Sequence, residues 1–274
     1  MLKQRVITAI ILLAGFLGAL FYMPDLPWVG LMIGMVLVAL YEWARLAKYS
    51  GSGTYIYLCL SLLLMLAVVW INIFHPAYSE FLHLILYALA VGLWVLIVPA
   101  WMIGGWQVRQ PLLLALTGWV LLIPAGLAMV DLRLQNPWLL LCVMSIVWVA
   151  DISAYFTGRK FGRHKLAPGI SPGKTWEGVG GALFGVSLYV LILIWANWLP
   201  ASQQMYPGIL FLAIWIIVGF AVIGDLFESA IKRQAGVKDS GTMLPGHGGL
   251  LDRIDALTST LPITAGVLLL QRYI

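Results

Sequence analysis

The sequence predicts an all-α protein, a polytopic membrane bundle of about nine transmembrane helices. Of its 274 residues, 62% are apolar and only 10% are charged, whereas a soluble domain usually carries about 25% charged residues. A soluble chain of this composition would expose much apolar surface to water, so the lipid bilayer is expected to be its solvent. Because backbone groups in lipid must be satisfied within the fold, the apolar segments are expected to be helices.

A bilayer core about 30 Å thick requires about 20 apolar residues per helix. The chain contains nine such runs, at 6–23, 28–47, 55–74, 81–103, 112–130, 138–157, 177–199, 207–227 and 256–273. The first run is long for a signal-peptide core and no small-residue cleavage site follows it, so we expect it to remain as a membrane helix. We divide the chain into anchoring membrane helices, 1–137, and a region with most of the polar clusters, 138–274.

Basic residues predict the orientation in the membrane, because cytoplasmic loops carry an excess of Lys and Arg. With the N-terminus in the cytoplasm, alternating helices place all 16 Lys and Arg residues on the cytoplasmic side except Arg133 and Arg272. The C-terminus is then outside. The two long, polar, glycine-rich connections, 158–176 and 228–255, both fall on the cytoplasmic side.

Composition also excludes several kinds of site. A net charge of only +5 does not suggest nucleic-acid binding. Cys59 and Cys142 lie inside apolar runs, and the four histidines are scattered, so neither a disulfide framework nor a zinc site is predicted.

The first polar cluster lies near the end of run 138–157. Asp151, Tyr155 and Gly158 follow one another at i, i+4 and i+7 and therefore share a helix face. An ionisable residue in a membrane is costly and usually faces a cavity or a partner. A salt bridge to a neighbouring helix is the alternative, and we favour a residue of a polar cavity.

The second cluster is Ser171 to Gly178, in which Gly-Lys-Thr resembles part of a phosphate-binding loop. We reject that interpretation because Pro168 occupies the position where the motif needs glycine, and because the motif also needs a preceding strand and a soluble βαβ unit around it. Ser171, Lys174 and Thr175 still offer donors just before a helix start near Trp176, where anions are favoured. The alternative is a loop that only caps the next helix.

The third cluster, Asp225, Glu228, Ser229 and Lys232, has the spacing i, i+3, i+4 and i+7. This spacing forms one polar stripe at the end of a membrane helix. An ordinary ion pair at a helix end is the alternative, but Asp225 follows an apolar run too closely for that.

The fourth cluster places Asp252 and Asp255 on one face where the last helix begins. Two adjacent carboxylates repel each other unless a cation neutralises them, and Mg²⁺ is commonly held by one or two carboxylates plus substrate phosphates. The glycines beside His247 let backbone amides approach a phosphate closely. The four clusters together indicate phosphoryl or nucleotidyl transfer that involves a lipid at the membrane–cytoplasm boundary.

At the third and fourth clusters the chain resembles the phosphatidate cytidylyltransferases. Each fixed position of that family's motif is present, namely Ser229, Lys232, Arg233, Lys238, Asp239, Gly241, Pro245, His247, Gly248, Gly249, Asp252, Arg253 and Asp255. The resemblance extends over roughly residues 145–274. Two positions depart from it: Ala256 stands where serine is frequent, and Gly173 where lysine is frequent.

The resemblance implies that CTP and phosphatidic acid give CDP-diacylglycerol and pyrophosphate with Mg²⁺ as cofactor, in the catalytic region 138–274. It implies metal ligation by Asp225, Asp252 and Asp255, and catalytic roles for Asp225, Asp252, Lys232 and Arg253. The residues expected to bind substrate or phosphate are Asp151, Ser171, Lys174, Thr175, Ser229, Arg233, Lys238, His247, Gly248 and Gly249. A second, monovalent cation and a homodimer are left open. We expect a multi-pass protein of a bacterial inner membrane with its active site toward the cytoplasm.

Two other functions remain as alternatives. A CTP-dependent lipid kinase would use the same clusters but transfer the γ-phosphoryl group, so only its products separate it from a cytidylyltransferase. An ion-coupled transporter would need ionisable residues at the membrane midplane and inverted repeats. The acidic groups here lie near one membrane face, which argues against transport.

Overall fold

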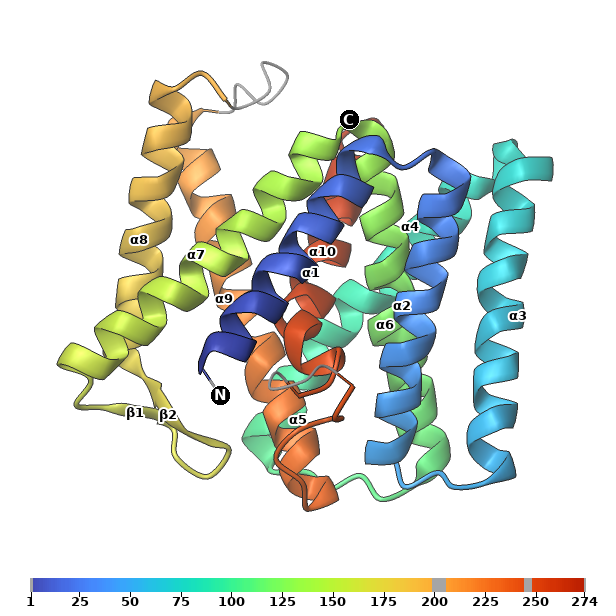
Figure 1. The fold of residues 1–274 in the computed structure, drawn as a ribbon, viewed down its shortest axis with the longest axis horizontal. Coiled ribbons are helices and arrows are strands. Elements are labelled where there is room, and N and C mark those ends of the chain that lie inside the picture. The colour runs from blue at the N-terminus through green and yellow to red at the C-terminus, as the bar shows by residue number, and fades with distance from the viewer. Residues whose placement is uncertain (1, 199–205, 244–247, 274) are drawn as a thin grey trace.

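The computed structural model describes residues 2–198, 206–243 and 248–273 and forms a helical bundle with a small hairpin (Figure 1). Side chains are described from residue 8 onward, apart from residue 207. The helices are α1 Leu2–Tyr22, α2 Asp25–Leu46, α3 Ser52–Phe74, α4 Pro76–Gly92, the π-helix η1 Leu93–Ile97, α5 Val98–Gly104, α6 Pro111–Gln135, α7 Pro137–Phe161, α8 Trp176–Trp195, α9 Pro207–Ala235 and α10 Leu251–Leu270. The strands are β1 Lys165–Ala167 and β2 Ser171–Thr175.

The membrane character predicted from composition is confirmed. Among the described residues, eight helical segments are long and apolar enough to cross a membrane, with α4, η1 and α5 counted as one segment. The first helix adds a shorter apolar stretch, Thr8–Tyr22. The chain is therefore a multi-pass membrane protein.

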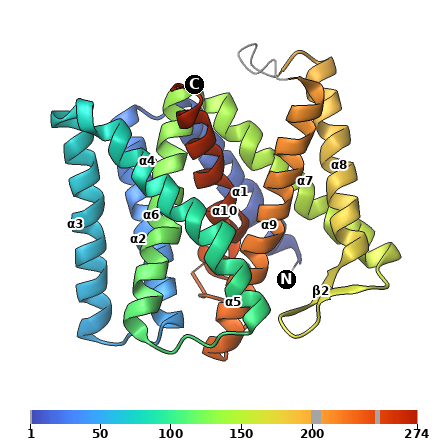
Figure 2. The same ribbon diagram turned by 180° about the vertical axis from the view of Figure 1, so that it is seen from behind.

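The centre of the bundle is formed by α6 and α10, which are the most buried spans. The last helix, α10, packs against α4, α6, α7 and α9. Figure 2, the view from behind, shows α4 crossing in front of α10. In contrast, α3 lies at one outer edge and α8 at the other (Figure 1), where α8 packs mainly on α7. Because α10 touches most of the bundle, the polar residues at its start are held by several elements at once.

Helix ends differ from the apolar runs, and the two long connections are shorter than expected. Helix α7 continues to Phe161, and α9 continues to Ala235, eight residues beyond the expected 227. The polar residues extend the same helices out of the apolar zone, because backbone hydrogen bonding does not stop where hydropathy falls. The segment 158–176 also contains the hairpin, in which Lys165 pairs with Thr175 in antiparallel register. The all-α prediction is thus correct for the membrane bundle and misses this short sheet.

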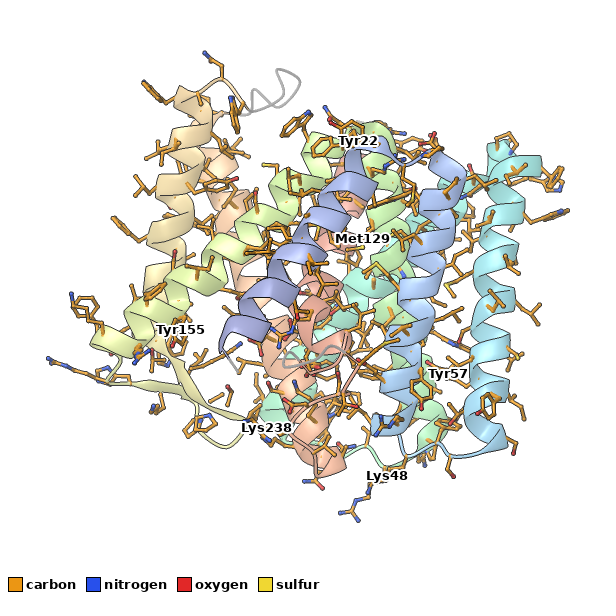
Figure 3. The ribbon with its side chains drawn as sticks, in the orientation of Figure 1. Tyr22, Lys48, Tyr57, Met129, Tyr155 and Lys238 are labelled. Atoms are coloured by element: carbon orange, nitrogen blue, oxygen red, sulfur yellow. The ribbon has the colours of Figure 1, made fainter. Side chains whose placement is uncertain are left out.

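The two ends of the bundle differ in charge. Figure 3 shows Lys48 and Lys238 at one end, while Tyr22 lies at the other. The end with the lysines is also where α2, α7 and α9 finish and where α6 and α10 begin. The loops that contain most of the basic residues therefore share one end, which we call the polar end. Which membrane face this end occupies stays a prediction.

Candidate active site at the polar end of the bundle

The polar stripe of α9 faces the start of α10 because a glycine brings the two helices together. At Gly224, a Cβ atom would lie 2.8 Å from the carbonyl oxygen of Asp255 and 2.8 Å from the Ser259 hydroxyl. Only glycine permits that approach without a shift of α10. The side chains that follow Gly224 on α9 therefore lie beside those that open α10.

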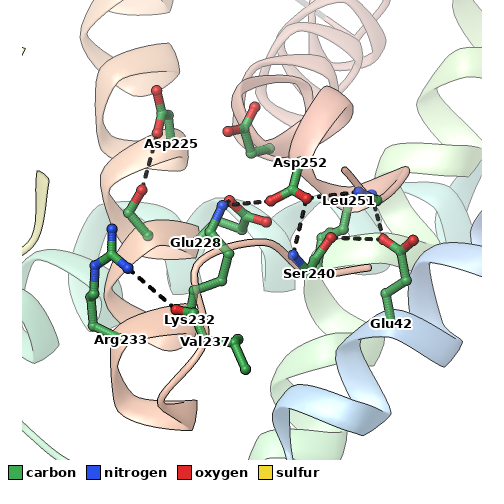
Figure 4. Close-up of polar contacts among 12 residues, drawn as sticks. Glu42, Asp225, Glu228, Lys232, Arg233, Val237, Ser240, Leu251 and Asp252 are labelled. Carbon is green, nitrogen blue, oxygen red and sulfur yellow. Dashed lines mark hydrogen bonds and ion pairs between the residues drawn. The ribbon is translucent and has the colours of Figure 1, made fainter. Parts of the chain in front are cut away.

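Lys232 of α9 lies between two carboxylates (Figure 4). Its Nζ atom is 2.5 Å from Oε2 of Glu228 and 2.6 Å from Oδ1 of Asp252. The three side chains are only 5–12% exposed, so these ion pairs are poorly screened by water. Removing one partner of such a buried group would leave an uncompensated charge. The Lys232 ammonium group is thus occupied by two carboxylates of the chain, and its expected catalytic role stays a prediction.

Asp252 also fixes the loop that precedes α10. Its Oδ2 atom accepts hydrogen bonds from the backbone amides of Ser240, at 3.0 Å, and Gly249, at 2.8 Å. The neighbouring Gly248 has a φ of 84°, a left-handed conformation that favours glycine. Here the amide of Gly249 binds a carboxylate of the chain itself, and the predicted approach of these glycine amides to a phosphate stays a prediction.

Glu42 of α2 is a buried member of this site that sequence reasoning missed. Its carboxylate accepts from the Ser240 hydroxyl at 2.9 Å and from the backbone amides of Leu250 and Leu251 at 3.0 and 2.8 Å. These amides belong to the first turn of α10 and its start, where a negative charge is favoured. The available signal was an acidic residue inside the apolar run 28–47, which is uncommon in a membrane helix.

The hairpin reaches the site through Lys174 of β2. Its Nζ atom is 2.7 Å from Oδ2 of Asp225, while Oδ1 of Asp225 accepts a longer bond, 3.4 Å, from the Ser229 hydroxyl. The Lys174 and Asp225 side chains are 23% and 33% exposed. The second and third clusters of the sequence are therefore in direct contact, as a shared site requires.

Three carboxylates influence one another electrostatically in the region of Lys174, without forming a close cluster. Asp225 lies within electrostatic range of both Asp151 on α7 and Asp255 on α10. Asp151 is exposed and forms no ion pair with another described residue, so the salt-bridge alternative is not seen in the part of the chain that the structure describes. The region contains more carboxylates than ammonium groups, because Glu228 and Asp252 already share Lys232. Added positive charge would stabilise it.

A metal cage is not preformed by these acids. Within the described ranges, no three His, Cys, Asp or Glu residues lie close enough together to hold a metal ion. The donor chemistry nevertheless fits Mg²⁺, which needs only one or two carboxylates when substrate phosphates and water complete its shell. Asp225 is the carboxylate that repels Asp255 most strongly, ahead of Asp151, so Asp225 and Asp255 are the pair that a cation would stabilise most.

Two hairpin residues that were predicted to bind phosphate, Ser171 and Thr175, differ in their surroundings. The Thr175 side chain is buried, and its hydroxyl accepts from the amide of Gly178 at 3.1 Å, so it caps α8. This geometry matches the capping alternative, and a phosphate contact of Thr175 stays a prediction. Ser171 opens β2 and is partly exposed.

Three basic residues that are close in sequence to Lys232 and Asp252 are exposed. Arg233, Lys238 and Arg253 are all exposed. The Arg233 guanidinium donates to the carbonyl oxygens of Ile170, at 3.4 Å, and Val237, at 3.3 Å, so it links the hairpin to the loop after α9. His247, predicted to bind phosphate, lies outside the described residues.

The whole chain is similar to known proteins. The cytidylyltransferase family model matches residues 3–270. Phosphatidate cytidylyltransferase from Pseudomonas aeruginosa is 40% identical over 273 residues, which cover 98% of this chain and 97% of the relative. Its counterpart from Haemophilus influenzae is 35% identical and covers 96% of each chain. A third, from Thermotoga maritima, is 44% identical over 45% of this chain and 46% of its own length.

Proposed function

The chain belongs to the cytidylyltransferase family, and we propose that its polar end is the place where it transfers CMP from CTP to phosphatidate in phospholipid synthesis. The products are CDP-diacylglycerol and pyrophosphate. The activity is assigned because the chain matches two relatives over nearly their whole length. The assignment of the place rests on the carboxylates and basic residues gathered where α9, α10 and the hairpin meet.

The reaction is an in-line displacement at phosphorus. An oxygen of the lipid phosphate attacks the α-phosphorus of CTP, and the bond between that phosphorus and the oxygen bridging to the β-phosphorus breaks, so that pyrophosphate leaves. The attacking phosphate is already an anion near pH 7, and no strong general base is needed. The protein therefore contributes mainly by positioning the substrates and by electrostatic stabilisation.

Magnesium is part of this proposal. Asp225 and Asp255 are the first candidates to hold it, because their carboxylates share the region of excess negative charge. Asp252 is the third candidate, since its Oδ1 has a single partner, Lys232, and a carboxylate oxygen has a further lone pair. A bound Mg²⁺ would offset negative charge on the phosphate oxygens as the bonds change.

The basic residues would hold the phosphates. Arg233, Lys238 and Arg253 are exposed and close in sequence to Lys232 and Asp252, and guanidinium groups bind phosphate oxygens in a bidentate manner. Lys174 is half-buried on Asp225, so it would add charge at the edge of the metal region. Lys232 orients Asp252 from within and is a positioning residue in this scheme.

The location of the site follows from its substrates. CTP is a cytoplasmic nucleotide and the relatives are bacterial proteins, so we place the chain in the inner membrane with its polar end toward the cytoplasm. The gathering of basic residues at that end supports this orientation. The homodimer and the second, monovalent cation stay predictions.

The comparisons favour CMP transfer over the two alternative functions, a CTP-dependent lipid kinase and an ion-coupled transporter. A direct test uses purified protein in detergent micelles with phosphatidate, Mg²⁺ and CTP labelled with ³²P at either the α or the γ position. We expect the α label in the lipid product and the γ label in pyrophosphate.

The two labels separate the outcomes. A γ label in the lipid fraction would identify a kinase and contradict CMP transfer. If turnover continues unchanged after EDTA removes the divalent cation, CMP transfer still stands but the proposed role of Mg²⁺ is wrong.

A further inference from the structure

A groove outside the carboxylate region opens between α2, α3 and the loop before α10. Its volume is about 460 Å³, and its lining includes Leu37 and Val38 of α2, Leu58 of α3 and Met243 of the loop. Helix α3 is the least buried span of the bundle and lies at its outer edge (Figure 1). The groove is therefore on a flank of the bundle that faces lipid, and its apolar walls suit a hydrocarbon chain.

The groove has one acidic and one basic side chain, and only the basic one is available to a ligand. Glu42 lines it, but its carboxylate already accepts three hydrogen bonds from Ser240, Leu250 and Leu251. Arg45, one turn further along α2, is exposed, and its guanidinium has no hydrogen bond or ion pair with any other described residue. The available charge of the groove is therefore positive.

The position of Arg45 matches the level of lipid head groups. Arg45 lies in the last turn of α2, which ends at Leu46 on the polar end of the bundle, close in sequence to Lys48, which Figure 3 shows at that end. Tyr41, four residues before Arg45, lies on the same helix face and is 45% exposed. An aromatic ring and a cation at a helix end are typical of the membrane–water interface.

We propose that this groove binds an anionic glycerophospholipid, with the lipid phosphate on Arg45 and one acyl chain along Leu37, Val38 and Leu58. Charge complementarity selects the occupant, because an anionic phosphate satisfies the unpaired guanidinium, while the apolar walls require a hydrocarbon chain. Its lining contains none of Asp225, Asp252 and Asp255, so this site differs from the proposed transfer site, although Glu42 borders both.

The test measures lipid binding by electron paramagnetic resonance, without CTP or metal. The protein is reconstituted in phosphatidylcholine nanodiscs that contain a trace of spin-labelled phosphatidylglycerol or, in parallel, spin-labelled phosphatidylcholine. We expect the wild type to prefer phosphatidylglycerol and Arg45→Gln to lose about fivefold of that preference, the factor equivalent to about 1 kcal/mol per basic residue near an anionic lipid surface.

Three further variants keep the test decisive. Arg45→Lys retains the charge and should retain most of the preference, whereas Leu58→Trp fills the apolar part and should reduce binding although Arg45 is intact. Lys48→Gln removes a neighbouring charge that does not line the groove and should have little effect.

The proposal is overturned if the wild type shows no preference for phosphatidylglycerol, or if Lys48→Gln and Arg45→Gln lose that preference equally. Because no CTP is present, either result is independent of the transfer reaction.

Discussion

At the scale of single residues, the site depends on how Asp252 is shared. One of its oxygens binds the Lys232 ammonium, and the other binds the amides of Ser240 and Gly249. The carboxylate thus orients a cation and a loop simultaneously. A neutral amide of the same shape would supply a donor where Asp252 supplies only acceptors.

Asp252→Asn should therefore reduce CMP transfer by about 100-fold or more, a loss typical when one preorganised electrostatic contact is removed from an active site. The bundle itself should persist, because the substitution is nearly isosteric. Labelled-CTP turnover measures the first effect and circular dichroism the second. Glu80→Gln is the control, since Glu80 contacts Arg272 and Tyr273 away from the site. Full activity in the Asp252 variant would refute this role.

Glu42 provides a second test at the residue scale. Its carboxylate accepts hydrogen bonds from two backbone amides at the start of α10 and from one hydroxyl. Glu42→Gln keeps the size of the side chain but removes the charge that the helix N-terminus favours, so we expect a loss of about 1–2 kcal/mol in stability. The apparent Tm in detergent should fall. An unchanged Tm would show that this buried carboxylate is not important for anchoring α10.

At the scale of elements, the approach of α9 to α10 through Gly224 sets the geometry of the stripe. Gly224→Ala would place a Cβ atom 2.8 Å from the backbone oxygen of Asp255, so the helices must separate. We expect both stability and transfer activity to fall, with an overpacking cost of about 1–3 kcal/mol.

Gly219 on the same helix is a matched control. A Cβ atom at Gly219 meets nothing within 4 Å, and alanine is a better helix former than glycine. Gly219→Ala should leave both the apparent Tm and the transfer rate near those of the wild type. Equal losses in the two alanine variants would contradict the packing explanation.

The opposite end of the bundle is held by Arg133 of α6. Its guanidinium donates to the carbonyl oxygens of Leu20 and Met23 at the end of α1 and pairs with Asp25 at the start of α2, 2.6 Å away. Arg133 is buried and also lies over the Trp28 ring. It thus satisfies helix-end carbonyls that have no partner within α1.

Arg133→Leu should lower stability by about 2 kcal/mol or more, because several hydrogen bonds to a charged group are lost together. The transfer rate of the folded fraction should stay close to that of the wild type, since this cluster lies at the end opposite the site. Thermal unfolding and a turnover assay at low temperature measure the two effects. A loss of turnover without a loss of stability would contradict a structural role.

The elements also show what the sequence predicts and where it fails. Hydropathy locates the membrane helices because burial in lipid requires long apolar runs, and the spacing on α9 identifies the stripe because helical geometry is regular. The role of Thr175 was not decidable, since a threonine before a helix suits a cap and a phosphate contact equally well. Glu42 was missed because its partners lie about 200 positions away in the chain, and no local pattern reports such a contact.

At the scale of the whole molecule, charge is segregated between the two ends of an apolar bundle. The polar end combines the acidic residues Asp225 and Asp255 with exposed basic residues such as Lys238, whereas the other end contains structural pairs such as Arg133 with Asp25. Glu42 also ties the N-terminal helices to the region 138–274. The first part of the chain therefore supports the site as well as anchoring it.

The central claim is that this acidic region holds a divalent cation together with CTP. The most direct measurement is Mn²⁺ binding by electron paramagnetic resonance, with Mn²⁺ in place of Mg²⁺ and CTP present, in wild type, Asp255→Asn and Glu80→Gln. We expect Asp255→Asn to weaken Mn²⁺ binding at least about tenfold, since losing even an indirect partner of a metal often costs that much, while Glu80→Gln binds like wild type. Equal affinity in all three proteins would contradict the account.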